Sequence, residues 1–138
     1  MIKFFEGGTG MKLSEYFEKT KGRGVIATSD SKGKVGMAVY GRPHFINEKT
    51  VAFIMADRLM HKNLQSNSYA AYLFMEAKER LVGKRLYLTK IKEAKDRSLI
   101  DKMRRRESCP AYTAYKDTIK YLVYFRIDKV LPLIGDEK

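Results

Sequence analysis

Two apolar runs with a short helical segment between them dominate the middle of the chain. Residues 51–56 (VAFIMA) form an apolar run of strand length, and residues 69–75 (YAAYLFM) form a second one. Between them, residues 59–65 have helical spacing that places Met60 and Leu64 on one face. The pattern therefore predicts a strand, a turn, a helix of one to two turns and another strand.

The turn before this helix has the composition of an anion site. Asp57 is a suitable N-cap, because its carboxylate can accept the free N–H groups of the first turn. Partial positive charge and free N–H donors at such an N-terminus favour a phosphate. The side chains expected around it are those of Arg58, His61, Lys62 and Asn63. A plain scaffold role is the alternative for this unit.

A hairpin is predicted on the N-terminal side of the central unit. Residues 24–29 (GVIATS) and 35–40 (VGMAVY) are of strand length, and residues 30–33 (DSKG) have turn chemistry. Gly33 can take the positive φ that the turn needs. Pro43 cannot donate to a ladder, so it marks a strand end, a bulge or a sheet edge.

Two amphipathic helices and more strands complete the prediction. Residues 13–19 have helical spacing, and so do residues 96–107, where Asp96 can cap the helix. Residues 86–91 and 119–127 have strand patterns. In the second of these strands one face, expected to point inward, carries Ile119, Tyr121, Val123, Phe125 and Ile127. Six or seven strands, mostly joined as hairpins around one core, predict a small antiparallel barrel with short helices, since closure removes exposed edges.

Length and composition fit a single domain over residues 1–138. Hydrophobic residues make up 44% of the chain, which is enough for a core, and no run approaches the length of a membrane span. The N-terminus lacks the apolar core of a signal peptide. The single cysteine, Cys109, excludes an internal disulfide and is expected to serve packing. These features favour a cytoplasmic protein.

The charge of the chain favours an anionic partner without naming it. Lysine and arginine number 28 against 16 acidic residues, so the formal net charge is +12. Nucleic acid, a phosphorylated cofactor and acidic lipid all fit, and a solvated lysine-rich surface fits as well. Residues 104–106 (RRR) suit either a nucleic-acid patch or a solvated helix end.

The side chains exclude several kinds of site. Two histidines and one cysteine make a structural zinc site unexpected, and no metal ligands are predicted. The chain has neither a GxGxxG nor a Walker loop. Its chemistry is therefore expected to belong to a bound organic cofactor.

Five segments occur in an order that is typical of one family. They are residues 24–43 (GVIATSDSKGKVGMAVYGRP), 50–67 (TVAFIMADRLMHKNLQSN), 70–76 (AAYLFME), 83–90 (GKRLYLTK) and 123–136 (VYFRIDKVLPLIGD). In this order the chain resembles the pyridoxamine 5′-phosphate oxidase-like family, the FMN-binding split barrels, over about residues 10–135. The resemblance implies a mainly β (α+β) fold with a six- to seven-stranded antiparallel split barrel, and FMN bound across a homodimer interface.

The resemblance also implies where FMN would lie. The residues that would border the flavin ring or the ribityl chain are Ala38, Val39, Tyr40 and Arg42. The strand end that would run along the isoalloxazine consists of Ile54, Met55 and Ala56. The residues that would hold the phosphate are Arg58, His61, Lys62 and Asn63. Lys84 and Arg85 would reach the polar edge of the flavin, where a cation can stabilise negative charge on the reduced ring. No catalytic side chain is implied.

Two departures from the family pattern shape the expected function. The family often carries Ser-Arg-Lys at the phosphate turn, where this chain has Arg58, Leu59 and Met60. The positive charge must then come from Arg58, His61 or Lys62. The chain also ends in PLIGDEK without the Arg and His pair that binds the vitamin substrate in the true oxidase. Oxidation of pyridoxamine 5′-phosphate is therefore not expected.

The leading hypothesis is an FMN-dependent or FMN-carrying oxidoreductase whose substrate and electron donor the sequence does not name. A deazaflavin or haem in the same cleft is one alternative, and a basic nucleic-acid-binding barrel without redox activity is another. Against nucleic acid, no compact stretch interleaves aromatic and basic residues on one strand face. Residues 69–75 are apolar on both faces, which favours a homodimer, because the core can cover one face and a partner subunit the other.

Overall fold

Seven strands and three short helices make up the parts of the chain that the computed structural model describes, residues 11–104 and 119–136. The strands are β1 Gly22–Ser29, β2 Val35–Tyr40, β3 His44–Asn47, β4 Thr50–Ala56, β5 Tyr69–Glu76, β6 Gly83–Ala94 and β7 Lys120–Pro132. The helices are α1 Leu13–Lys19, α2 Leu59–Leu64 and α3 Arg97–Met103. All the strand pairs are antiparallel, in the order β2-β1-β5-β6-β7-β4-β3.

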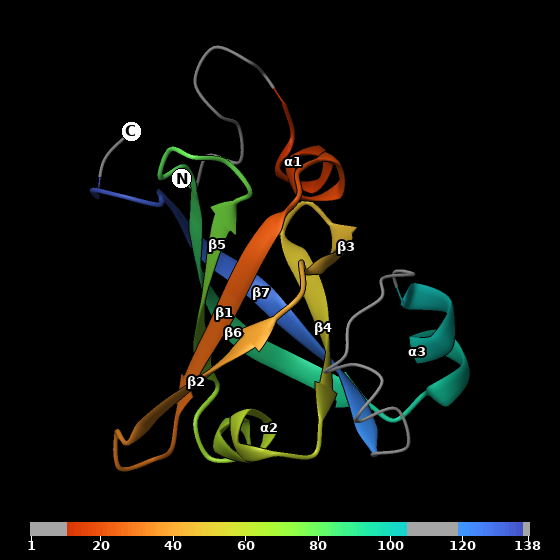
Figure 1. Ribbon diagram of the computed structural model, residues 1–138. Coiled ribbons are helices and arrows are strands. Elements are labelled where there is room, and N and C mark those ends of the chain that lie inside the picture. The colour runs from red at the N-terminus through yellow and green to blue at the C-terminus, as the bar shows by residue number, and fades with distance from the viewer. Residues whose placement is uncertain (1–10, 105–118, 137–138) are drawn as a thin grey trace.

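The sheet curls around one main core, with α1 at one end of it and α2 at the other (Figure 1). Side chains alternate across each strand, so every second residue of β1, β5 and β6 points into this core. Aromatic rings fill its centre: the ring centroids of Phe17 and Phe74 lie 5.0 Å apart, and so do those of Phe53 and Tyr72. α3 packs a smaller apolar cluster against β4 and β7.

The sheet is open, and α2 packs across one end of it, against β1, β2 and β4. β2 and β3 are the edge strands and do not pair with each other. A Cβ on Gly36 of β2 would lie 2.8 Å from Met60 Cε, so this edge sits directly on α2. The Asn63 amide donates to Thr28 Oγ1 at 3.1 Å, which ties α2 to β1 as well. The barrel is therefore not closed as expected: its two edge strands stay unpaired with each other, and α2 packs against one end of the open sheet.

The predicted N-terminal elements are confirmed. The helix over residues 13–19 is α1, and the hairpin is β1 and β2, with β1 beginning two residues earlier than predicted. Gly33 takes a φ of 84° in the connecting turn. Val35, Met37 and Val39 share the outer face of β2 and are 78%, 74% and 81% exposed.

The N-cap prediction for Asp57 is wrong. The Asp57 N–H donates to the Ile119 carbonyl at 3.1 Å, which continues the pairing of β4 and β7 past the end of β4. α2 therefore begins at Leu59, with Arg58 in the N-cap position and no side-chain capping bond. Tertiary strand pairing has overridden a local capping signal.

The helix predicted over residues 96–107 begins as expected but ends early. Asp96 caps it by accepting a hydrogen bond from the Leu99 N–H at 3.0 Å. α3 ends at Met103, and Arg104 is extended. Leu99, Ile100 and Met103 pack against the smaller cluster, and no apolar side chain continues that stripe after Met103. The rest of the arginine triplet and Cys109 lie outside the described residues.

The longest helices among the described residues have seven residues. None of the helices in this part of the chain has the length and apolar character that crossing a membrane requires.

Candidate functional site

A cleft of about 560 Å³ opens beside the first turn of α2. Its lining residues come from the turn after β4, from α2, from the far end of β6 and from the start of β7: Asp57, Arg58, Leu59, His61, Lys62, Gln65, Glu93 and Tyr121. Arg58 and Lys62 are exposed at the cleft. Two cations and two carboxylates therefore share one concave surface.

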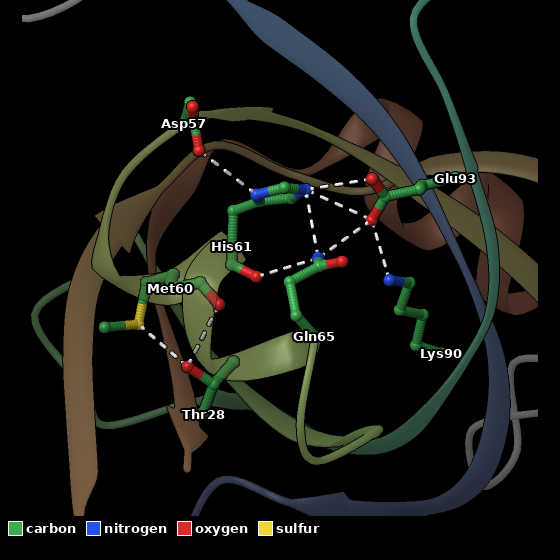
Figure 2. A network of polar contacts seen from close by, with 7 residues as sticks. All are labelled: Thr28, Asp57, Met60, His61, Gln65, Lys90 and Glu93. Atoms are coloured by element: carbon green, nitrogen blue, oxygen red, sulfur yellow. Dashed lines mark hydrogen bonds and ion pairs between the residues drawn. The ribbon is translucent and has the colours of Figure 1, made fainter.

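His61 is the buried centre of this cleft (Figure 2). Its Nε2 lies 3.1 Å from both carboxylate oxygens of Glu93. Its ring stacks on Tyr121, with the centroids 3.9 Å apart and the planes 10° from parallel. The Gln65 amide donates to Glu93 Oε1 and to the His61 carbonyl, each at 3.1 Å. Since a carboxylate only accepts, Nε2 carries a proton.

Glu93 is held in its ionised form. Burial raises the pKa of its carboxyl, but hydrogen bonds from Lys90, Gln65 and His61 outweigh burial and lower that pKa to about 2. The contact to Lys90 Nζ is the shortest of these, at 2.7 Å. A charged carboxylate thus joins β6 to α2.

The other nitrogen of His61 has no hydrogen-bond partner. Nδ1 is buried and lies 3.5 Å from Asp57 Oδ1 without a hydrogen bond. With the proton on Nε2, a neutral imidazole offers a lone pair at Nδ1, and the Asp57 carboxylate offers only lone pairs. The buried Nδ1 lone pair then faces a carboxylate oxygen, with no proton between the two acceptors.

Tyr40, the last residue of β2, is close enough to the cleft to be affected by the charge of Arg58. Burial raises the pKa of Tyr40 to about 12, and the positive charge of Arg58 lowers it in part. The Tyr40 ring meets Phe53 edge-on, with the centroids 6.1 Å apart. Tyr40 is therefore a neutral phenol that packs against the main core, within the electrostatic influence of the Arg58 guanidinium.

Family models and curated protein sequences give no match to the chain. Solved structures do match. An FMN-binding protein from Syntrophomonas wolfei has a TM-score of 0.68 at 19% identity, over 88% of this chain and 84% of that one. An F420 reductase has a TM-score of 0.64 at 12% identity, over 91% and 98%.

A third match names the family that the sequence resembles. It is a Clostridium acetobutylicum protein of the pyridoxinephosphate oxidase family, related to general stress protein 26, with a TM-score of 0.57 at 13% identity, over 83% of this chain and 80% of that one. The chain has the FMN-binding split-barrel fold. The fold that the sequence resemblance implies is confirmed, and identities this low speak for the fold alone.

The split barrel brings together only some of the residues predicted to bind a cofactor. Arg58, His61 and Lys62 line the cleft, with Tyr40 nearby. Asn63 is buried and bonded to Thr28.

The β2 and β4 residues of the predicted site divide between core and surface. Ala38 packs against the main core, and Met55 is fully buried in it. Val39 points to the outer face, and Ile54 packs in the smaller cluster under α3. Ala56 is half-buried at the last position of β4.

Arg42 lies at the α1 end of the split barrel, away from the cleft. Its Nη1 donates to three carbonyl oxygens, those of Phe17 at 2.9 Å, Glu18 at 3.2 Å and Thr20 at 3.1 Å. These carbonyls belong to the C-terminal end of α1, where the chain leaves acceptors unpaired and a cation is favourable. Arg42 thus caps the C-terminal end of α1 with its side chain.

Arg85 is also engaged within the chain. Its Nε donates to the Pro132 carbonyl at 2.9 Å, and its Nη2 contacts the Gly135 carbonyl and lies 3.3 Å from Asp136 Oδ1. The side chain thus holds the segment that follows β7.

Lys84 is buried at the α1 end, with 2% of its surface exposed. Its Nζ lies 4.3 Å from the centre of the Tyr16 ring, and the Tyr16 hydroxyl donates to Glu76 at 2.5 Å. Burial raises the pKa of Glu76, but hydrogen bonds from Tyr16 and Lys78 and the charges of Lys78 and Lys84 bring it below its usual value. Lys84 thus helps to keep a buried carboxylate ionised.

Three cleft residues were missed by the sequence analysis: Gln65, Glu93 and Tyr121. Tyr121 was placed on the inward face of its strand, which is a signal for burial but not for a site. Glu93 lies beyond the end of the strand predicted over residues 86–91. No spacing in the sequence connects it to His61, since only the fold brings the end of β6 to α2.

Proposed function

We propose that the protein binds FMN in this cleft and acts in hydride or electron transfer. The observation that supports the proposal is a split-barrel fold with a cleft beside α2 that carries the cations Arg58 and Lys62. Solved proteins of similar fold include one described as FMN-binding and an F420 reductase. FMN would supply the redox chemistry, and the residues of this chain would bind and orient it.

The phosphate of FMN would be held mainly by side chains. α2 has six residues, so its dipole is small, and its N-cap residue makes no capping bond. Arg58 and Lys62 stand on the same turn and can each give a charge-assisted hydrogen bond to a phosphate oxygen. Tyr40, as a neutral phenol, can add a neutral one.

The homodimer is part of the same proposal. The outer face of β2 exposes Val35, Met37 and Val39. The apolar surface continues across the sheet, because Met37 pairs with Ala27 of β1, which pairs with Ala71 of β5. A second copy related by a two-fold axis would cover this face, burying on the order of 2,000 Å² in total.

A titration of FMN against riboflavin tests the cofactor proposal. The two ligands differ only by the phosphate, and each charge-assisted hydrogen bond contributes about 1.5–3 kcal/mol, so FMN should bind at least about tenfold more tightly. Arg58→Ala should narrow this gap and leave riboflavin affinity nearly unchanged. Arg80→Ala, an exposed arginine in the β5–β6 connection, is the matched control and should change neither affinity. Equal affinities of the wild-type protein for both ligands would refute the phosphate site.

A deazaflavin or haem in the same cleft is the second candidate, and the likeness to an F420 reductase favours the deazaflavin. Mass spectrometry of the small molecule released from the purified protein by denaturation separates these cofactors. A single cysteine suits a reducing compartment, and we propose the cytoplasm as the place of action.

A further inference from the structure

The role inferred for His61 rests on the proposed binding of an anion in the cleft. The imidazole is 5% exposed and lies between two carboxylates: Glu93 at Nε2 and Asp57 at Nδ1 (Figure 2). The Glu93 side is satisfied, since Nε2 donates to it. The Asp57 side is not, since Nδ1 has no hydrogen-bond partner at 3.5 Å. One proton at Nδ1 would turn this contact between two acceptors into a charge-assisted hydrogen bond.

We propose that His61 is a positioning residue of the cleft, whose second proton engages the Asp57 carboxylate and so strengthens the binding of a phosphate or sulfate group by Arg58 and Lys62. Asp57 is half-exposed on the same cleft, so its free charge opposes any anion bound there. Once Nδ1 donates to it, part of that charge is neutralised and its direction is fixed. The net charge of the cleft rises by one, and the Asp57 carboxylate that repels the anion is paired with a cation.

The surroundings of His61 allow this step from every side. From α2 come Arg58 and Lys62 at the cleft, and Asp57 comes from the preceding turn. From β6 come Glu93 and its partner Lys90, and Lys95 follows directly after β6, with its Nζ 5.3 Å from the centre of the Tyr121 ring. From β7 comes Tyr121, stacked on the imidazole. Two carboxylates, Asp57 and Glu93, contact the ring, and four cations, Arg58, Lys62, Lys90 and Lys95, surround it.

The sign of the coupling follows from linkage. If a proton on His61 favours the anion, the anion must favour the proton equally. Anion affinity should therefore rise as pH falls through the titration of His61. A saturating anion should also move that titration to higher pH.

Sulfate is the first probe, because its charge does not change across the titration range of histidine, unlike that of a phosphate monoester. His61 and His44 are the two histidines of the chain, so NMR can follow each ring, with His44 on β3 as the internal control. We expect sulfate to move the midpoint of His61 to higher pH by about 0.7 units or more, equivalent to a fivefold coupling, and to leave His44 in place. An unmoved His61 midpoint with sulfate bound would overturn the proposal.

Asp57→Asn is the sharper test. An asparagine amide can donate to Nδ1 of a neutral imidazole, so the variant needs no second proton to complete the contact. The affinity of Asp57→Asn for sulfate and for FMN should be nearly independent of the protonation state of His61. At any pH it should equal the affinity that the wild-type protein reaches at low pH. Glu79→Gln, an exposed change in the β5–β6 connection, removes one negative charge elsewhere and should keep the wild-type pH dependence. A variant Asp57→Asn with an unchanged pH dependence of sulfate affinity would contradict the mechanism.

The outcomes separate this inference from the proposed function. If FMN does not bind while sulfate still moves the His61 titration, the flavin proposal fails and the role of His61 stands. The opposite outcome is that FMN binds with the same affinity ratio to riboflavin whether His61 is neutral or charged, once the titration of the FMN phosphate itself is corrected for. In that case the role of His61 fails and the flavin proposal stands. Wild-type NMR alone decides the matter should the variant not fold.

Discussion

Replacing Glu93 by glutamine should remove a pH-dependent part of the stability of the protein. The pKa of Glu93 falls from 4.5 to about 2 on folding, through hydrogen bonds from Lys90, Gln65 and His61 that outweigh burial. At 1.36 kcal/mol per pH unit, and with 24% of the side chain still exposed to water, this corresponds to about 2–3 kcal/mol at neutral pH. Glutamine keeps the shape of the side chain and its carbonyl acceptor but removes the charge.

The direction of the pH effect follows from the lowered pKa. Ionised Glu93 stabilises the folded state fully above about pH 4.5, and this contribution disappears as pH falls towards about 2. Near pH 2 the wild-type side chain is about half protonated in the folded protein, and below that pH it becomes as uncharged as glutamine. The wild-type protein should therefore exceed Glu93→Gln by about 2–3 kcal/mol at pH 7, and the two should converge at the acid end.

Urea unfolding followed by circular dichroism, at one protein concentration and several pH values, measures this difference. The other shifted carboxyl, Glu76, is present in both proteins, so its acid titration cancels in the comparison. Glu79→Gln, a change at an exposed residue, should match the wild-type protein at every pH. A stability gap for Glu93→Gln that stays constant from pH 7 to pH 2 would refute the electrostatic account of the His61–Glu93 contact.

Three further predictions concern the interface and the backbone. Val39→Lys should turn the proposed dimer into a monomer in sedimentation at micromolar concentration, because Val39 lies on the outer apolar face, whereas Leu81→Lys, also at an exposed apolar residue, should leave a dimer. Gly83→Ala should abolish soluble folded protein, since its Cβ would meet a β5 carbonyl oxygen at 1.9 Å, while Gly41→Ala has open space and should change the free energy of unfolding by less than about 0.5 kcal/mol. Arg42→Ala should lower the free energy of unfolding by about 1.5–3 kcal/mol in urea titrations, because α1 loses the donor for its last carbonyls, and Arg42→Lys should recover only part of that loss.

The parts of the fold that local patterns encode were predictable. Alternation over residues 119–127 predicted the inward face of β7, and Val123, Phe125 and Ile127 are indeed buried. Turn chemistry predicted the β1–β2 hairpin and the positive φ of Gly33. These features depend on residues within a few positions of one another, so a single sequence contains the whole signal.

The parts that failed or were missed depend on distant partners. The local signal for Asp57 is a helix cap, but its N–H pairs with the Ile119 carbonyl and the helix begins only after Arg58. Arg42 follows a strand end and was predicted to border the cofactor. In the structure its guanidinium donates to carbonyls at the end of α1, more than twenty residues away in the sequence. Glu93 reaches His61 only because β6 continues past a register shift at Lys90 and Lys92. A single sequence does not specify such pairings.

The strand order has a consequence for how the chain folds. β4 has the four-residue β3 on one side, and on the other side β7, which follows it by more than sixty residues. The edge of β4 that faces β7 can therefore be paired only after the last strand has left the ribosome. Pairings this distant slow folding, and they leave an unpaired apolar strand exposed while the chain is being made. For this protein, the rate at which β7 reaches β4 sets the interval during which a chaperone, or an unwanted neighbour, can bind that strand.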